Sequence, residues 1–477
     1  MEYAVAGVEG ALAAGARYAD ARVMIRRSES MSAQNGHIEG LDQREQAGVG
    51  VRALIGSSWG FFATAELTAA AARAAGTVAA ETAKASALVP GPPLELAPVE
   101  AVQAHWESVC VEDPLSVPLS EKGDLLVTVT AVGRHAGAQL AQAHYEVWDT
   151  EKWFASSEGA RISQRIRECG TGMSVTAIGD GETQRRSYPG IRGQVGTRGW
   201  ELIREIDLVG NAARIGEEAV ALLSAPVCPE VTTDLILGSE QMALQIHESV
   251  GHATELDRIL GWEAAFAGTS WLDLAQMGSL RFGSELMNIT ADATIPGALG
   301  SFGYDDEGTP ARSVDIVKDG IWVGVLSGRD SAALAGIPCG GMVRADGHDR
   351  IPMVRMTNIG LLPGPHSLEQ MIAETADGVM MDTNRSWSID DRRLNFQFGC
   401  EIGWEIKDGR RGRMLRNPTY TGISPQFWGS MDMVGGPSEL VAWGTPNCGK
   451  GQPMQVGHTG HPAVPCRFRG VRVGVRG

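Results

Sequence analysis

Three prolines and a glycine within five residues are the feature that most restricts how this chain can fold. The run Val89-Pro-Gly-Pro-Pro93 cannot continue a helix or a central strand, because proline has no N–H to donate and its ring clashes with the preceding helical turn. A chain of 477 residues has room for two or three domains. We therefore expect a linker here and a second boundary before Pro226, which divides the chain into residues 1–88, 89–225 and 226–477.

Composition narrows the class of protein. With 43% hydrophobic and 21% charged residues the chain is globular, and its 61 glycines and 22 prolines favour antiparallel strands joined by turns. The net charge of -16 excludes general binding to nucleic acid or to an anionic membrane. There is no basic start followed by an apolar run, and no uncharged apolar run reaches the roughly 20 residues that span a bilayer. Seven scattered cysteines without a CxxC pair favour reduced thiols, so we expect a soluble, cytoplasmic protein.

Periodicity in the first two stretches predicts helices packed on antiparallel strands. Alternation with a period of two begins at Ala19, and Asn35-Gly36 is typical of a hairpin turn. Two short strands joined at Gly56-Ser-Ser58 are expected within residues 48–63, and several more strands between 138 and 187. Helices are expected over residues 5–17, 67–87, 119–135 and 200–223.

The third stretch begins with a predicted strand over residues 232–237. Ser239 is then the expected N-cap of a helix whose apolar residues run from Met242 to Ile259. The rest is strand-like, with hairpin turns at Lys318-Asp-Gly320 and Lys407-Asp-Gly409. The fold class is therefore predicted to be α+β, with N-terminal helices on antiparallel strands and a C-terminal antiparallel, barrel-like domain that has a metal-binding helix at its start.

That helix carries His247-Glu-Ser-Val-Gly-His252, in which two histidines flank a glutamate. Zinc protease helices space their histidines at i and i+4, whereas here the spacing is i and i+5. On a regular helix this spacing turns the two side chains about 140° apart, too far to share one ion. A shared ion therefore requires a π-bulge, which Gly251 would ease, or a helix that ends near Val250. Otherwise, these are two unrelated histidines on a core helix.

Motifs along almost the whole chain give it a recognisable resemblance. They are Tyr18-Ala-Asp-Ala-Arg22, Ser28-Glu-Ser-Met-Ser32, Ala47-Gly-Val-Gly-Val-Arg52, Trp59-Gly-Phe61, the HExxxH motif with Ala253-Thr-Glu-Leu-Asp-Arg258, Tyr304-Asp-Asp-Glu-Gly308, Asn447-Cys-Gly-Lys-Gly-Gln452 and Val456-Gly-His458. In kind and order these resemble the TldD/PmbA family of metalloproteases, formerly called modulators of DNA gyrase.

The resemblance implies a function and a set of site residues. In active members the two histidines and a distant cysteine hold zinc, which maps here onto His247, His252 and Cys448, and Glu248 matches the catalytic base. Relatives hydrolyse unfolded or short peptides inside the cavity of a two-chain assembly, either a homodimer or a heterodimer with an inactive TldE/PmbA-like homologue. Some process peptide natural products. The alternatives are a metal-dependent hydrolase of a small amide in secondary metabolism and a non-catalytic peptide-binding subunit.

Several residues near these motifs admit more than one reading. Glu255 follows His252 by one helical turn and is either a third ligand in place of Cys448 or a hydrogen-bond partner of an imidazole. His458 either stabilises an oxyanion, as a catalytic residue, or makes a structural hydrogen bond, and with His461 it could form a cluster near Cys448. Asp257 is expected to be a charge on the helix face.

Two further features near the C-terminal end bear on the predicted zinc site. Gly444-Thr-Pro-Asn-Cys-Gly-Lys450 fits the spacing of a phosphate-binding loop, but Gly451 replaces the hydroxyl residue that binds magnesium. Cys466 is expected to be a small core residue, although a second thiol this close to Cys448 leaves the ligand set open.

Overall fold

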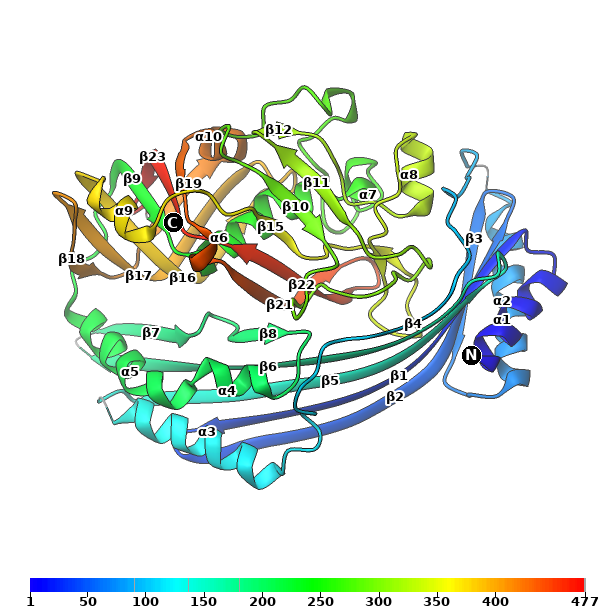
Figure 1. Ribbon diagram of the computed structural model, residues 1–477, viewed down its shortest axis with the longest axis horizontal. Coiled ribbons are helices and arrows are strands. Elements are labelled where there is room, and N and C mark those ends of the chain that lie inside the picture. Colours follow the sequence, from blue (N-terminus) through cyan, green and yellow to red (C-terminus); the bar gives the residue numbers. More distant parts are fainter. Residues whose placement is uncertain (90, 136, 180, 476–477) are drawn as a thin grey trace.

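The computed structural model describes residues 1–89, 91–135, 137–179 and 181–475, and Pro90 of the predicted linker lies outside them. The N-terminal half is built on one long, curved sheet of order β3-β2-β1-β5-β6-β4, with β7 and β8 also paired to β6 (Figure 1). Because β1 pairs with β5, this sheet is continuous across the stretch that contains the linker. Its strands are β1 (Tyr18–Gln34), β2 (His37–Ile55), β3 (Ser58–Thr64), β4 (Gln103–Glu107), β5 (Leu140–Ser156), β6 (Arg161–Gly179), β7 (Glu182–Tyr188) and β8 (Gln194–Gly196).

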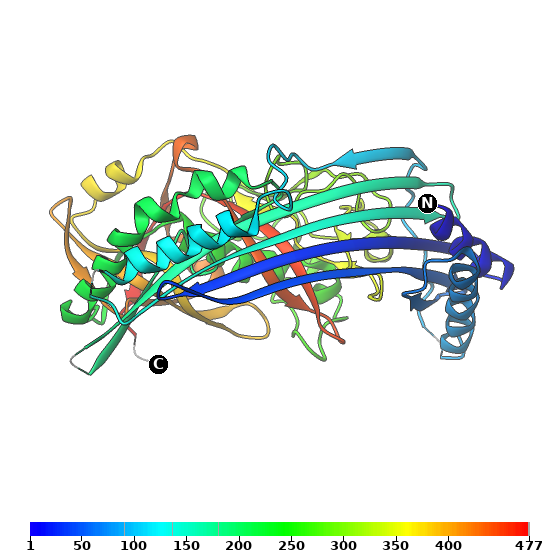
Figure 2. The same ribbon diagram turned by 90° about the horizontal axis from the view of Figure 1, so that it is seen from below.

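Helices pack against both ends of this sheet (Figures 1 and 2). At one end are α1 (Glu2–Ala13) and α2 (Ala69–Ser86), and at the other are α3 (Leu119–Arg134), α4 (Glu201–Ile206) and α5 (Leu208–Ser224). The prediction of one helix over residues 200–223 is wrong, because the chain forms the two helices α4 and α5 there. Asp207 adopts φ 49° and ψ 60°, which interrupts the helix, and its side chain caps α5 by accepting the N–H of Gly210.

The C-terminal part contains a closed barrel, so the α+β fold class is confirmed. Its strands pair in the order β16-β9-β23-β19-β17, and a further pairing of β16 with β17 closes the ring. They are β9 (Val231–Leu237), β16 (Asp377–Ile389), β17 (Asn395–Lys407), β19 (Thr419–Ile423) and β23 (Cys466–Val473), with β18 (Arg410–Leu415) and β20 (Met431–Val434) paired to β17 and β23.

Smaller elements surround the barrel. A four-stranded sheet has the order β12-β11-β10-β15, and β21 (Val441–Lys450) and β22 (Gln455–Ala463) form a hairpin. The remaining elements are β10 (Ile289–Asp292), β11 (Ser313–Lys318), β12 (Ile321–Trp322), β13 (Val343–Arg344), β14 (Met353–Val354), β15 (Ile359–Leu361), α8 (Arg329–Ala335), α9 (Leu368–Ala373) and α10 (Ser424–Gly429). None of the helices in the described ranges combines the length and apolarity needed to cross a membrane.

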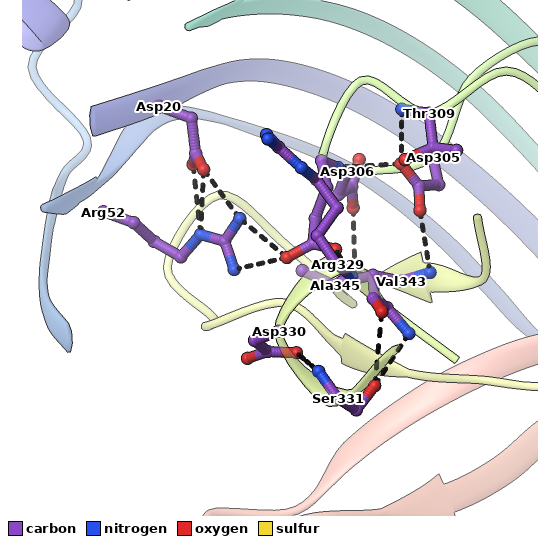
Figure 3. A network of polar contacts seen from close by, with 12 residues as sticks. Asp20, Arg52, Asp305, Asp306, Thr309, Arg329, Asp330, Ser331, Val343 and Ala345 are labelled. Atoms are coloured by element: carbon purple, nitrogen blue, oxygen red, sulfur yellow. Dashed lines mark hydrogen bonds and ion pairs between the residues drawn. The ribbon is translucent and has the colours of Figure 1, made fainter. Parts of the chain in front are cut away.

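A buried ionic network joins the N-terminal sheet to the C-terminal part (Figure 3). Arg52 on β2 pairs with Asp20 at 2.6 Å and with Glu307 at 3.3 Å. Asp305 accepts the backbone N–H groups of Glu307, Thr309 and Val343. Asp306 also pairs with cations of the sheet, Arg22 and Lys152. The acidic motif Tyr304–Gly308 therefore holds the two halves of the chain together.

Candidate metal centre

The helix that carries the two histidines starts directly after barrel strand β9. It is α6 (Ser239–Ile246), and its apolar face is buried in the largest hydrophobic core. The N-cap is Gly238, so the prediction that Ser239 caps this helix is wrong. Ser239 Oγ instead accepts a hydrogen bond from the indole of Trp443 at 3.1 Å, which ties α6 to the β21–β22 hairpin.

The predicted distortion of this helix is confirmed. Residues His247–Gly251 form a π-helical turn, in which the N–H of His252 donates to the carbonyl oxygen of His247, five residues earlier. A short 3₁₀ turn (His252–Thr254) and α7 (Leu256–Ile259) follow. The wider turn brings the two imidazoles to the same side of the helix, with ring centroids 4.8 Å apart.

Gly251 supports this turn in a different way from the one expected. Its φ of -53° and ψ of -62° are open to any residue, so the turn does not depend on glycine's conformational freedom. A Cβ at this position would lie 2.4 Å from Sδ of Met356. Glycine is needed here because the distorted helix packs closely against a neighbouring side chain.

Cys448 on β21 completes a group of three potential metal ligands. Each of His247, His252 and Cys448 offers one ligand atom, and these three atoms lie within 4.8 Å of one another. All three residues are buried. Nε2 of His252 is 3.7 Å from the Cys448 sulfur. Two ligands on one tetrahedral zinc are roughly 3.6 Å apart for bonds of about 2.05 and 2.3 Å, so the spacing fits this ion.

Protonation of the two histidines also fits a metal site. Burial lowers the pKa of His252 to about 3, and burial with the neighbouring His252 and His461 holds the pKa of His247 well below its usual range. Both imidazoles are therefore neutral, as coordination requires. Burial raises the pKa of the Cys448 thiol, so a cation would have to stabilise its thiolate form.

Hydrogen bonds set the tautomer of His247. Nδ1 of His461 lies 3.1 Å from the carbonyl oxygen of Ile359 and must carry the proton, which leaves its Nε2 as an acceptor. That Nε2 is 2.8 Å from Nδ1 of His247, so Nδ1 of His247 donates and its Nε2 keeps a free lone pair. His461, predicted only as part of a cluster near Cys448, therefore orients the ring of His247, a potential metal ligand.

Glu255 plays the corresponding part for His252. Its Oε2 lies 2.9 Å from Nδ1 of His252, which leaves Nε2 of that ring facing Cys448. Burial alone would raise the pKa of Glu255, but Lys450, His252 and Arg258 hold it well below its usual range. Of the two readings of Glu255, this geometry supports the hydrogen-bond partner rather than the third ligand.

Asp257 and Lys450 form a buried ion pair next to Glu255. Asp257 is buried and pairs with Lys450 at 2.8 Å, so its prediction as a charge on the helix face is wrong. Lys450 also lies 3.2 Å from Glu255 and is fully buried. The lysine of the GxxxxGK spacing thus connects the strand of Cys448 to the segment that follows His252.

Glu248 projects from the π-turn between the two histidines. Its Oε2 accepts a hydrogen bond from Nη1 of Arg393 at 2.6 Å, in the loop between β16 and β17. Burial raises the pKa of Glu248, although the charges of Arg393 and Arg192 oppose this. Neither arginine was identified from the sequence, because each lies far from the motif and no local pattern marks it.

His458 is not brought to this group. Cys448 pairs with Gly457 across the hairpin, so His458, one residue later, points to the opposite face. Its Nδ1 lies 3.0 Å from Glu168 of β6, and its ring packs on Trp148 at 4.7 Å between centroids. Cys466 is fully buried in barrel strand β23, as expected of a core residue.

Two neutral imidazoles, a thiol and a neighbouring carboxylate are a donor set suited to a metal-dependent hydrolase. The comparison with known families agrees: residues 19–87, 112–225 and 230–473 match PmbA/TldA metallopeptidase domain 1, central domain and C-terminal domain, respectively. The chain therefore belongs to the TldD/PmbA family of metallopeptidases.

Relatives named as metalloproteases align with this chain over more than nine-tenths of their own length. A metalloprotease of Methanocaldococcus jannaschii is 28% identical over 444 residues, covering 93% of this chain and 94% of the relative. A metalloprotease TldD homologue of Buchnera aphidicola is 28% identical over 462 residues, covering 94% and 91%.

Solved structures share the fold. A Thermotoga maritima protein described as a modulator of DNA gyrase has a TM-score of 0.78 at 16% identity and covers 99% of both chains. TldE from Thermococcus kodakarensis has a TM-score of 0.72 at 16% identity and covers 98% of both chains.

Proposed function

We propose that the protein hydrolyses peptides with a zinc ion held by His247, His252 and Cys448. The observation that carries this proposal is the convergence of their donor atoms within 4.8 Å, on a helix that is distorted at the point where a shared ion requires it. Three protein ligands leave a fourth position open, which is characteristic of catalytic rather than structural zinc. When bound there, zinc would polarise a carbonyl group and lower the pKa of a water molecule to about 7.

The protein's own residues supply the proton transfer in this proposal. Glu248 is the general base, and it would take up a proton on Oε1, since Oε2 is held by Arg393. It would then return the proton to the leaving amine. Arg393 fixes the rotamer of this carboxylate, and His461 and Glu255 fix the two ligand rings.

We propose short or unfolded peptides as substrates, including precursors of peptide natural products. We also propose that the chain works in a two-chain assembly that encloses the site, with an inactive homologue or with a second copy of itself. The resemblance to active family members supports this, and so does the existence of a TldE protein with the same fold.

Replacing Glu248 by glutamine tests the proposed reaction. Glu248→Gln keeps the shape of the side chain and its acceptor for Arg393, so it should bind one zinc per chain like the wild type. Peptide cleavage should fall by a factor on the order of 10² to 10⁴. Glu217→Gln, at an exposed position on α5, is the matched control and should cleave at the wild-type rate. Near-wild-type cleavage by Glu248→Gln at full zinc content would reject the proposed role.

A further inference from the structure

Two arginines that donate to the β21–β22 hairpin lack an ion-pair partner. Arg355 is only 2% exposed, and its Nη2 donates to the carbonyl oxygen of Cys448, while Nε and Nη1 are buried without a partner. Arg344 donates from Nη2 to the carbonyl oxygen of His458 at 2.7 Å, and its Nε is also buried without a partner. Among the described residues, no carboxylate lies within 4.0 Å of either guanidinium. Buried guanidinium N–H groups without an acceptor are costly, which points to a missing anion.

Both arginines line a cavity of about 70 Å³ between the N-terminal sheet and the β21–β22 hairpin. This is room for a few water molecules or one small anion. The acidic residues in its wall already have partners. Asp306, seen in Figure 3, pairs with Arg22 and Lys152. Glu168 lies against His458, and Asp346 pairs with Arg26. Glu168 and Asp306 act on Arg344 only at longer range, so Arg344 and Arg355 are cations of this wall without an ion-pair partner.

Arg355 connects the wall of this cavity to the strand that carries Cys448. A Cβ on Gly457 would lie 2.3 Å from Nη2 of Arg355, so only glycine leaves room for this guanidinium. Gly457 and Cys448 are directly paired across the hairpin, and directly paired residues face the same side. The guanidinium of Arg355 is therefore on the face of the hairpin that carries the Cys448 sulfur.

We propose that this cavity binds a small oxyanion group, a carboxylate or a phosphate, through Arg344 and Arg355. Each guanidinium is a planar fork of donors that matches such a group, and each has unused N–H groups. Burial and the charge of Arg355 lower the pKa of Arg344 to about 10 although Glu168 and Asp306 oppose this, and a bound anion would raise it. The group has two possible sources, the C-terminal carboxylate of a peptide and free inorganic phosphate.

Calorimetric titration of the zinc-loaded protein with inorganic phosphate, and separately with acetate, tests the site. At least one should bind saturably at one site per chain, with a Kd of about 1 mM or tighter. Arg344→Gln and Arg355→Gln should each weaken binding at least about tenfold while zinc content stays at the wild-type level, which excludes binding to the metal itself. Arg416→Gln is the matched control, since Arg416 also donates to a backbone carbonyl and has a buried, unpartnered Nε.

A second titration with a peptide carrying a free C-terminal carboxylate, and with its C-terminal amide, separates the two sources. Competition between phosphate and the free-acid peptide alone assigns the site to a peptide terminus, and phosphate binding without such competition assigns it to a free anion. If the wild type binds neither anion saturably, the site does not exist. If Arg344→Gln and Arg416→Gln bind equally well, the anion lies elsewhere. Neither result depends on whether peptides are cleaved, so a failure of the site is distinct from a failure of the proposed hydrolysis.

Discussion

Replacing Glu255 by glutamine should weaken zinc binding without removing a ligand. The carboxylate accepts a hydrogen bond from His252 at 2.9 Å and is fully buried. Glu255→Gln keeps an acceptor of similar size but removes the negative charge. A hydrogen bond to a charged group contributes about 1.5–3 kcal/mol and a neutral one about 0.5–1.5 kcal/mol, so the loss is about 1–1.5 kcal/mol. Zinc affinity should therefore fall about tenfold, within the tenfold to hundredfold range typical of such partners.

Zinc competition with a chromophoric chelator measures this change, and Asp257→Asn is the matched control. Asp257 is also buried and also pairs with Lys450, at 2.8 Å, but its hydrogen bonds and ion pairs include neither histidine. Both variants should lose stability, while Asp257→Asn should keep its zinc affinity within about threefold of the wild type. A complete loss of stoichiometric zinc in Glu255→Gln, together with full retention in Cys448→Ala, would make Glu255 the ligand and refute this reasoning.

Three other changes test the surrounding structure. Gly251→Ala should lower the free energy of unfolding, measured in urea titrations, by about 1–3 kcal/mol because the new Cβ meets Met356. Adding Met356→Ala to this variant should restore part of the lost stability. An unchanged unfolding midpoint in Gly251→Ala would contradict the close packing of Gly251 on Met356. Arg52→Met should lower stability by about 3–5 kcal/mol because it leaves buried carboxylates unpaired, and a loss below about 1 kcal/mol would contradict this. Burial raises the pKa of Glu240 to about 7, above its value in the unfolded chain. The stabilisation of the folded state by the protonated Glu240 is therefore complete below about pH 4.5 and is lost as pH rises through 7. Glu240→Gln should flatten the fall in stability between pH 5 and 8, and an unchanged slope would argue against the raised pKa.

Local turn chemistry made part of the fold predictable. Asn35 and Gly36 both have positive φ, as do Asp319-Gly320 and Asp408-Gly409, and these residue types tolerate that conformation. The hairpins they form were therefore visible in the sequence. The pairing of β1 with β5 was not, because it joins strands more than a hundred residues apart and depends on packing rather than on any local pattern.

The helix over residues 200–223 shows where periodicity fails. Its apolar spacing continues through Asp207, so the pattern alone indicates one helix. The left-handed conformation of Asp207 changes the direction of the chain, and such a conformation leaves little trace in hydrophobic spacing.

At the site, the sequence indicated a distorted helix, either a π-bulge or an end near Val250, because five-residue spacing and a shared ion are incompatible on a regular helix; the structure has the π-turn. It did not indicate Arg393, which reaches Glu248 from 145 residues away. It also did not reveal that Lys450 is buried between Glu255 and Asp257, because charge pairing of this kind is set by tertiary structure. The proposed ligands could be named from the sequence because its motifs resemble those of a known family, whereas the groups that orient their rings depend on the fold.

X-ray absorption at the zinc edge of the purified protein tests the central claim most directly. With His247, His252 and Cys448 as ligands, the spectrum should show one sulfur at about 2.3 Å and two imidazole nitrogens at about 2.0–2.1 Å, with a light oxygen atom completing the shell. Cys448→Ser should remove the sulfur signal and leave both imidazoles. A wild-type zinc shell without sulfur, or a protein that binds no zinc at all, would contradict a zinc site formed by His247, His252 and Cys448.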